Sequence, residues 1–332
     1  MRGFKRALRV AALTAACLVV VSGSPAAAAE KIVFADMSWD SIMVQNRIVA
    51  FIIDHAYGYD SDYMPGATPV VVQGLVAGDV DVDMESWTQN IQEVYDKAMA
   101  GGKILDLGPS LATTSQGWFV PRYVVEGDQE RGIEPMAPGL KTVFDLPEYW
   151  ELFRDPEQPD KGRYYNAIAG WAITEKLSQK LEAYGLDEYY NDFIPGSDAA
   201  LSGSLAAAYE RGKPWFGYYW APTWVLGKYD MIMLEEPPYD PQVWEETRAC
   251  AIPPTDVNIL VNTTLTDRAP EVLALLQKYE ISEDNANKFL FYMKDKQANA
   301  MQTAQWFLKN NEDVWTRWLP AKDAAKVKKA LQ

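Results

Sequence analysis

Cysteine and histidine are almost absent from this 332-residue chain, and each scarcity excludes a class of protein. The two cysteines, Cys17 and Cys250, exclude a fold held by several disulfides, so a hydrophobic core must stabilise the protein. The single histidine, His55, excludes a zinc site built from several histidines and leaves one candidate base for a serine hydrolase. It lies on an apolar helical pattern, where a packing role is usual. We therefore expect no metal and no enzyme, with a calcium ion among the acidic residues 187–198 as the open alternative.

The chain also has fewer positive than negative charges, and it lacks a glycine-rich phosphate loop. The chain has 31 Lys and Arg against 46 Asp and Glu, which gives a formal net charge of −15. Nucleic-acid binding needs a basic footprint, so we expect no nucleic-acid partner. No glycine-rich loop of the Walker or dinucleotide type occurs in the sequence, and we expect no cofactor. The negative field of such a protein mildly favours a cationic ligand.

Long hydrophobic runs are missing too, apart from one short run at the start of the chain. Residues 10–21 are apolar, small residues follow as far as Ala29, and the run comes after four basic residues, Arg2, Lys5, Arg6 and Arg9. The run is shorter than the about 20 residues that span a bilayer, and the pattern is typical of a secretory signal peptide. We expect residues 1–29 to be removed after Ala29, leaving a periplasmic protein with Cys250 as its only cysteine. A lipoprotein signal ending at Cys17 is the alternative, but the residues before Cys17 match a lipobox poorly.

Strand-like and helix-like patterns alternate along the rest of the chain. Short buried strands are expected at 31–35, 80–84, 104–107, 164–169, 215–220 and 257–261, with a further candidate at 70–72, and helical patterns lie between most of them. This alternation predicts an α/β fold with mostly parallel sheets.

Prolines interrupt the chain five times between residues 237 and 254, which indicates a crossing between two parts of the fold. We expect two lobes. Residues 30–116 begin lobe 1, residues 117–244 form lobe 2, and residues 245–332 return to lobe 1 and end in helices. A cleft between two lobes is a preferred place for a small ligand. One large single domain is the alternative.

Tryptophan, by contrast, is abundant, and four of the 12 tryptophans sit at the carboxyl ends of expected strands. Trp39 and Trp87 follow strands of lobe 1, Trp171 follows a strand of lobe 2, and Trp220 closes another. In open α/β sheets, ligands bind outside the carboxyl ends of the strands. Closing the lobes would bring two rings from each lobe together, so we predict a cage made of these four tryptophans.

A cage of indole faces suits a quaternary or trimethylated ammonium group. Such a group has no N–H to donate, whereas the electron-rich ring faces attract its positive charge, and each desolvated contact contributes about 2 kcal/mol. Sugars also stack on aromatic rings, so a secreted glycoside-binding or glycoside-hydrolysing protein is the alternative. A glycosidase needs two carboxylates roughly 5–10 Å apart across the scissile bond. At the expected strand ends the sequence singles out only one carboxylate, that of Glu85, where a glycosidase needs two.

Glu85 precedes Trp87 by two residues at the same strand end, so its carboxyl group can project into the cleft. A charged carboxylate there favours a simple cation and repels the carboxylate of a betaine, while a protonated one can donate to an N-oxide. We predict that Glu85 contacts the ligand, with a solvated loop acid as the alternative.

The segments around these residues resemble the glycine betaine/proline betaine substrate-binding proteins of ABC importers, the OpuAC-like group. The resemblance covers most of the mature chain, and the segments that carry it are residues 37–41, 81–87, 117–121, 169–171, 196–200 and 218–222. It implies a two-lobed type II periplasmic-binding-protein fold with the ligand cleft between the lobes. It also implies delivery of the ligand to a membrane permease with a cytoplasmic ATPase. We expect the protein to be a monomer.

The resemblance also implies an aromatic cage for an ammonium head, and the cage residues carried over to this chain are Trp39, Trp87, Trp171 and Trp220. The ligands of such proteins include glycine betaine, choline and trimethylamine N-oxide. No Arg or His stands beside the four tryptophans in the sequence to bind the carboxylate of a betaine. Trimethylamine N-oxide and choline therefore stay open beside glycine betaine.

Overall fold

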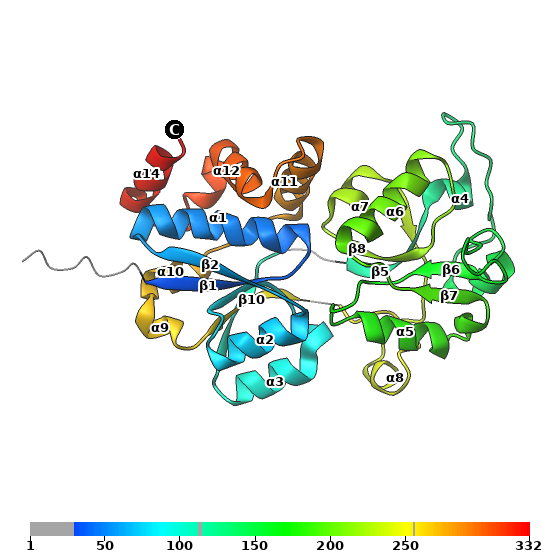
Figure 1. The fold of residues 1–332 in the computed structure, drawn as a ribbon, viewed down its shortest axis with the longest axis horizontal. Coiled ribbons are helices and arrows are strands. Elements are labelled where there is room, and N and C mark those ends of the chain that lie inside the picture. The colour runs from blue at the N-terminus through cyan, green and yellow to red at the C-terminus, as the bar shows by residue number, and fades with distance from the viewer. Residues whose placement is uncertain (1–29, 112–114, 255) are drawn as a thin grey trace, which may run out of the picture.

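The computed structural model describes residues 30–111, 115–254 and 256–332, which fold into two α/β lobes lying side by side (Figure 1). The expected signal peptide, its cleavage after Ala29 and Cys17 lie outside the described residues. Each lobe has its own five-stranded sheet, so the two-lobed α/β fold expected from the sequence is confirmed. The expectation of mostly parallel sheets is wrong, because β10 in lobe 1 and β5 in lobe 2 each run antiparallel to both of their neighbours. No helix in the described part of the chain is long and apolar enough to cross a membrane.

The sheet of lobe 1 has the strand order β2-β1-β3-β10-β4. β1 pairs in parallel with β2 and β3, with Phe34 opposite both Tyr63 and Val82, and β10 runs antiparallel between β3 and β4. Because β10 comes from the last third of the chain, distant segments of the sequence share this sheet. The strands are β1 Lys31–Asp36, β2 Asp60–Pro65, β3 Val82–Trp87, β4 Ile104–Pro109 and β10 Val257–Asn262.

Helices cover both faces of this sheet. α1 (Asp40–Tyr57) packs on one face, and α11 (Glu283–Asp295), α12 (Ala300–Asn310) and α14 (Ala321–Ala330) pack against α1 from outside (Figure 1). α1 is therefore buried on most of its circumference. α2 (Thr68–Ala77) and α3 (Gln92–Ala100) cover the other face. The shorter helices are the 3-10 helix η1 Thr88–Ile91, α9 Leu265–Arg268, α10 Pro270–Leu276 and α13 Glu312–Trp315.

The sheet of lobe 2 has the order β7-β6-β8-β5-β9. β6 pairs in parallel with β7 and β8, and β5 runs antiparallel between β8 and β9. The strands are β5 Ser115–Pro121, β6 Gly162–Tyr165, β7 Tyr190–Phe193, β8 Gly217–Ala221 and β9 Met231–Met233. The helices are α4 Arg122–Glu126, α5 Thr174–Ala183, α6 Asp198–Glu210, α7 Trp224–Lys228 and α8 Pro241–Glu246, with 3-10 helices η2 Val143–Tyr149 and η3 Leu186–Glu188.

Some elements differ from the sequence expectation. Residues 70–72, expected as a strand, lie in helix α2. Three consecutive valines favour a strand by propensity, but Pro69 stands in the first turn of a helix and Gly78 ends it at φ +92. β2 and β7 were not expected, because both are edge strands with polar sequences and lack the apolar pattern of a buried strand.

Candidate ligand-binding site

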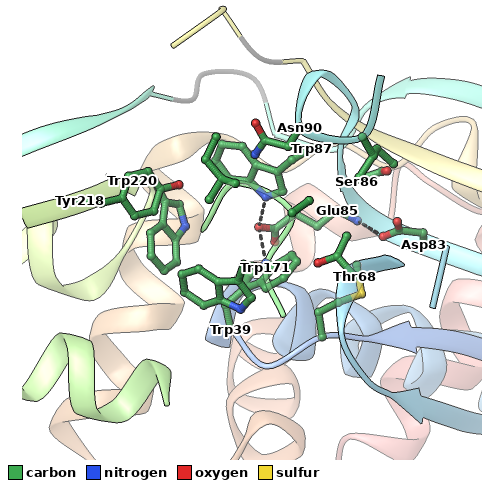
Figure 2. A pocket seen from close by; sticks show the side chains of 14 residues that line it. Trp39, Thr68, Asp83, Glu85, Ser86, Trp87, Asn90, Trp171, Tyr218 and Trp220 are labelled. Atoms are coloured by element: carbon green, nitrogen blue, oxygen red, sulfur yellow. Dashed lines mark hydrogen bonds between the residues drawn. The ribbon is translucent and has the colours of Figure 1, made fainter. Parts of the chain in front are cut away.

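A pocket lies between the two lobes, where the carboxyl ends of β1 and β3 face β8 and the start of α5 (Figure 2). It encloses about 460 Å³ of space not filled by protein atoms, a volume that includes its opening to solvent. Lobe 1 and lobe 2 both contribute to its wall. The lining residues are Met37, Trp39, Thr68, Asp83, Glu85, Ser86, Trp87, Asn90, Ile91, Trp171, Ala172, Ile173, Tyr218 and Trp220.

All five site residues expected from the sequence line this pocket. Trp39 is the residue before α1, and Trp87 is the last residue of β3. Trp171 precedes α5, and Trp220 lies within β8, on the side of the pocket opposite Glu85 (Figure 2). Trp39 and Trp220 are buried and the other two rings are half-buried.

The rings meet edge to face, one pair across the boundary between the lobes and one pair within lobe 2. Trp39 and Trp171 have centroids 5.8 Å apart and planes at 86°. Trp171 and Trp220 have centroids 4.8 Å apart and planes at 89°. Such T-shaped pairs place a positive ring edge against a negative ring face. Perpendicular neighbours form the corners of an enclosure, whereas a parallel stack would fill it.

Glu85 anchors the two indole rings of lobe 1. Its Oε1 accepts hydrogen bonds from Trp39 Nε1 at 2.8 Å and from Trp87 Nε1 at 3.3 Å. Ser41 Oγ donates to the same oxygen at 2.9 Å, and Gln45 Nε2 donates to Oε2 at 2.7 Å. Because the side chain has no exposed surface, the alternative of a solvated loop acid is wrong.

Burial sets the electrostatics of this carboxyl group. It disfavours the charged form and raises the pKa of Glu85 to about 7, although the hydrogen bonds from Ser41, Trp39 and Trp87 oppose the shift. Burial likewise raises the pKa of Asp83 to about 6. Asp83 Oδ1 accepts the Glu85 N–H at 3.1 Å, while its buried Oδ2 has no hydrogen-bond partner among the described residues. The pocket wall therefore contains two acidic groups whose pKa values burial brings close to neutral pH.

Several lining residues were missed by the sequence analysis. Tyr218 and Trp220 alternate along β8 and face one side of the sheet, so the two-residue spacing could have identified Tyr218. Asp83 could not be found in this way, because the pairing of β3 with β10 shifts register between Asp83 and Ser86. The Tyr218 ring stacks with Trp220 at 6.0 Å, and its hydroxyl donates to Gln116 Oε1 at 2.9 Å. Thr68 and Asn90 carry no such signal, because the packing of their helices brings them to the pocket.

Neither His55 nor the acidic residues 187–198, all of which the structure describes, belong to a group arranged to hold a metal ion. The His55 ring contacts Phe51 edge to face at 4.3 Å on the surface side of α1, as a packing role requires. Within residues 30–111, 115–254 and 256–332, no group of three or more His, Cys, Asp or Glu side chains is arranged to hold a metal ion.

Two α/β lobes that meet over a pocket form the two-lobed architecture of periplasmic binding proteins. The chain belongs to the family described as the substrate binding domain of ABC-type glycine betaine transport systems, whose sequence model matches residues 30–310. Members of this family are substrate-binding proteins, so the alternative of a glycoside-binding or glycoside-hydrolysing protein is not supported.

Individual relatives agree with this assignment. The trimethylamine N-oxide-binding protein of Pelagibacter ubique is 23% identical, over 86% of this chain and 89% of its own. The glycine betaine/L-proline-binding protein ProX of Borrelia burgdorferi superposes with a TM-score of 0.72 at 20% identity, covering 90% of this chain and 100% of that one. An ABC-transporter choline binding protein in complex with choline also gives 0.72, at 18% identity over 91% and 98%. These structures confirm the two-lobed fold.

Proposed function

We propose that the protein captures a small trimethylated amine and delivers it to an ABC permease in the membrane, driven by a cytoplasmic ATPase. In this proposal Trp39, Trp87, Trp171 and Trp220 form the cage that holds the ammonium head, and Glu85 acts behind the rings. The observation that carries the proposal is the convergence of four indole rings, two from each lobe, on one pocket with a fully buried carboxyl group.

Glu85 makes the cage selective for positive charge. Its carboxylate accepts the indole N–H groups of Trp39 and Trp87, and this polarises both rings so that their faces become more negative. A cation against those faces is attracted by the rings, at about 2 kcal/mol for each desolvated contact, and by the carboxylate itself. Three or four such contacts supply several kcal/mol, as micromolar binding requires once other contacts contribute.

The charges around the pocket favour some methylated amines over others. Asp83 and Glu85 bring two carboxyl groups to the wall, and none of the described lining residues is Lys, Arg or His. Glycine betaine carries a carboxylate of its own, which these groups repel. Choline and trimethylamine N-oxide carry none. We therefore place these two ahead of glycine betaine, and the Pelagibacter relative, named for N-oxide binding, supports the choice.

The protein in this proposal is a monomeric carrier without catalytic activity, which works in the periplasm and begins at Glu30 after signal removal. The family supports the carrier role, and a relative from Escherichia coli is a glycine betaine/proline betaine-binding periplasmic protein. Intact-mass measurement of exported protein, together with light scattering, tests these points. A lipid on Cys17 or a stable dimer would contradict them.

The limits of the lobes are also a proposal. We expected lobe 2 to end at residue 244 and the return to lobe 1 to begin at residue 245. Lys180 of α5 donates to the carbonyl of Cys250 at 2.7 Å, and the N–H of Ala251 donates to the carbonyl of Pro237 at 2.8 Å. These contacts hold residues 245–251 against lobe 2. We therefore propose that the return crossing begins after Ala251.

Isothermal titration calorimetry of the mature protein tests the function. The ligands are choline, trimethylamine N-oxide and glycine betaine, with the disaccharide cellobiose as the control for a glycoside site. We expect micromolar or tighter binding of at least one amine, weaker binding of glycine betaine and none of cellobiose. Binding of the sugar without binding of any amine would overturn the proposal.

A further inference from the structure

Polar contacts cross the cleft beside the pocket and join the two lobes directly. The N–H of Thr68 donates to the carbonyl of Gly170 at 3.0 Å, and Trp171 Nε1 donates to Ser38 Oγ at 3.2 Å. Lys176 Nζ donates to the carbonyls of Asn90 at 2.8 Å and Gln89 at 3.4 Å. The lobes are therefore in a closed arrangement held by bonds from each side.

We propose that Lys176 is a positioning residue that locks the lobes over the bound ligand. It lies on α5, five residues after Trp171, and its ammonium reaches the turn η1, which directly follows Trp87. One side chain thus bridges the element that carries a cage ring of lobe 2 and the element that carries a cage ring of lobe 1. Lys176 itself is not among the lining residues, so it acts through closure and not through contact with the ligand.

The chemistry of this bridge suits a latch. An ammonium donating to carbonyl oxygens makes charge-assisted bonds, which are about twice as strong as neutral ones. Its partners here belong to the opposite lobe, so both bonds break when the lobes separate. In the open form water solvates the ammonium and the two carbonyls, so opening exposes no unpaired buried group. Closure also buries the ammonium, which lowers the pKa of Lys176, so the two bonds to the carbonyls must offset this desolvation and are lost when the lobes separate.

The neighbouring contact shows how closely the lobes approach. Gly170 adopts φ +93, and a Cβ added to it would lie 3.1 Å from the Cβ of Ala67 on the opposite lobe. Only glycine fits both the left-handed backbone and this spacing. The backbone bond between Thr68 and Gly170 fixes the two surfaces in register, and the flexible Lys176 side chain can form its bonds as they meet.

A latch of this kind changes the lifetime of the complex. The ligand leaves only after the lobes open, so weakening the closed form accelerates dissociation, whereas association depends on the open form and changes little. Stopped-flow tryptophan fluorescence with the tightest-binding amine measures both rates. For Lys176→Met we expect dissociation about tenfold faster or more, as the loss of charged hydrogen bonds implies, with association within about twofold of wild type.

Matched variants separate the latch from a general loss of structure. Lys176→Arg keeps the charge and the donors and should restore most of the slow dissociation. Lys309→Met removes an exposed lysine of α12 and should leave both rates unchanged. Lys176→Gln, a milder change, takes the place of the Met variant if that protein folds poorly. Small-angle scattering should show a larger open fraction for Lys176→Met at equal ligand saturation.

The proposal rests on the tryptophan cage, and the two can fail separately. Normal affinity in three of the four cage variants, Trp87→Ala among them, would contradict the cage. Weak binding in Trp87→Ala together with wild-type dissociation in Lys176→Met would overturn the latch alone. The latch would also be overturned if the ligand dissociated from Lys176→Arg as fast as from Lys176→Met. Arginine keeps the charge and the donors, so loss of the bonds to Gln89 and Asn90 could not then be the cause of the faster dissociation.

Discussion

Trp39 and Glu85 stand 46 residues apart in the chain and are joined by a 2.8 Å hydrogen bond from the indole N–H to the carboxylate. The same oxygen accepts the N–H of Trp87. One buried carboxyl group therefore fixes the orientation of two rings and, when it is ionised, places a negative charge behind them. This relationship links the charge of the pocket to its shape, and the predictions on the ligand follow from it.

Replacement of Glu85 distinguishes the ligand classes. For choline, Glu85→Gln should weaken binding about tenfold, because a charge that attracts the cation is lost. For glycine betaine the same change should be neutral or favourable, since a like-charge repulsion disappears. For an N-oxide held by a protonated Glu85, Gln should be partly tolerated and Ala should not. Calorimetry of wild type and both variants measures this, and unchanged affinity for all three ligands would contradict any role of Glu85.

Removal of single cage rings should weaken binding without unfolding the protein. Trp39→Ala, Trp87→Ala, Trp171→Ala and Trp220→Ala should each cost about 1–3 kcal/mol of binding free energy, through lost cation–π contact and lost burial. Trp315→Ala is the matched control, because this ring is fully buried in lobe 1 and its N–H bonds the carbonyl of Leu308. It should lower the melting temperature and leave affinity unchanged. Normal binding in three of the four cage variants would show that the site lies elsewhere.

The affinity for a cation should depend on pH near neutrality. Burial raises the pKa of Glu85 to about 7, so the unliganded site binds a proton around and below that pH. A bound cation favours the carboxylate and lowers this pKa, so binding releases a proton and affinity rises with pH. The rise is at most tenfold per pH unit and ends above pH 8. Calorimetry from pH 5.5 to 8.5 measures it.

The Glu85→Gln variant supplies the control for this pH dependence, since it should flatten the part of the profile near pH 7. Asp83, whose pKa burial raises to about 6, accounts for any dependence that persists at lower pH. If an N-oxide accepts a hydrogen bond from protonated Glu85, the pH dependence of binding has the opposite sign, and the affinity falls as the pH rises through 7. A profile that is flat for every ligand would contradict the involvement of this carboxyl group.

Asp198 should limit the stability of the protein at alkaline pH. It begins α6, its buried Oδ1 has no hydrogen-bond partner among the described residues, and burial together with the charge of Asp40 raises its pKa to about 7. The folded state thus holds a proton that the unfolded state releases near pH 4. This stabilising contribution is complete below about pH 4 and is lost as the pH rises through 7. Asp198→Asn should raise the melting temperature at pH 8 by a few degrees, with a smaller effect at pH 5.

The control for this prediction is Asp313→Asn, which changes an exposed acid in the first turn of α13. Its effect on the melting temperature should be small and equal at both pH values. A lower melting temperature of Asp198→Asn at pH 8 would show that the charge of Asp198 stabilises the folded protein, as a carboxylate at a helix start can do.

The sequence was sufficient to predict that the four tryptophans and Glu85 lie at one pocket, because the strand ends and the two-residue spacing within strands are local patterns. β3 and β8 each place alternate residues on one face, so Glu85 and Trp87 were found together. The role of Glu85 as an anchor depends on Trp39, Ser41 and Gln45, which reach it only through the packing of α1 on the sheet.

Contacts between the lobes could not be predicted in the same way. The bond from Lys176 to Asn90 joins an ordinary helical lysine to a backbone carbonyl, and neither residue carries a distinctive pattern. The edge strands β2 and β7 were missed because their pairing depends on the neighbouring strand and not on their own polar residues. Local patterns thus predicted the rings, while the surfaces that close over them required the tertiary structure.

The comparison of each amine with its neutral carbon isostere tests the central claim most directly. In the isostere a tert-butyl group replaces the trimethylammonium group with almost the same shape, as in tert-butanol for trimethylamine N-oxide and the corresponding alcohol for choline. Calorimetry should show the isostere of the tightest ligand binding about 30-fold more weakly or worse, because the attraction of the indole faces and Glu85 for positive charge is lost. Equal affinity for the amine and its isostere would contradict the account, since the pocket would then recognise only size and apolar surface.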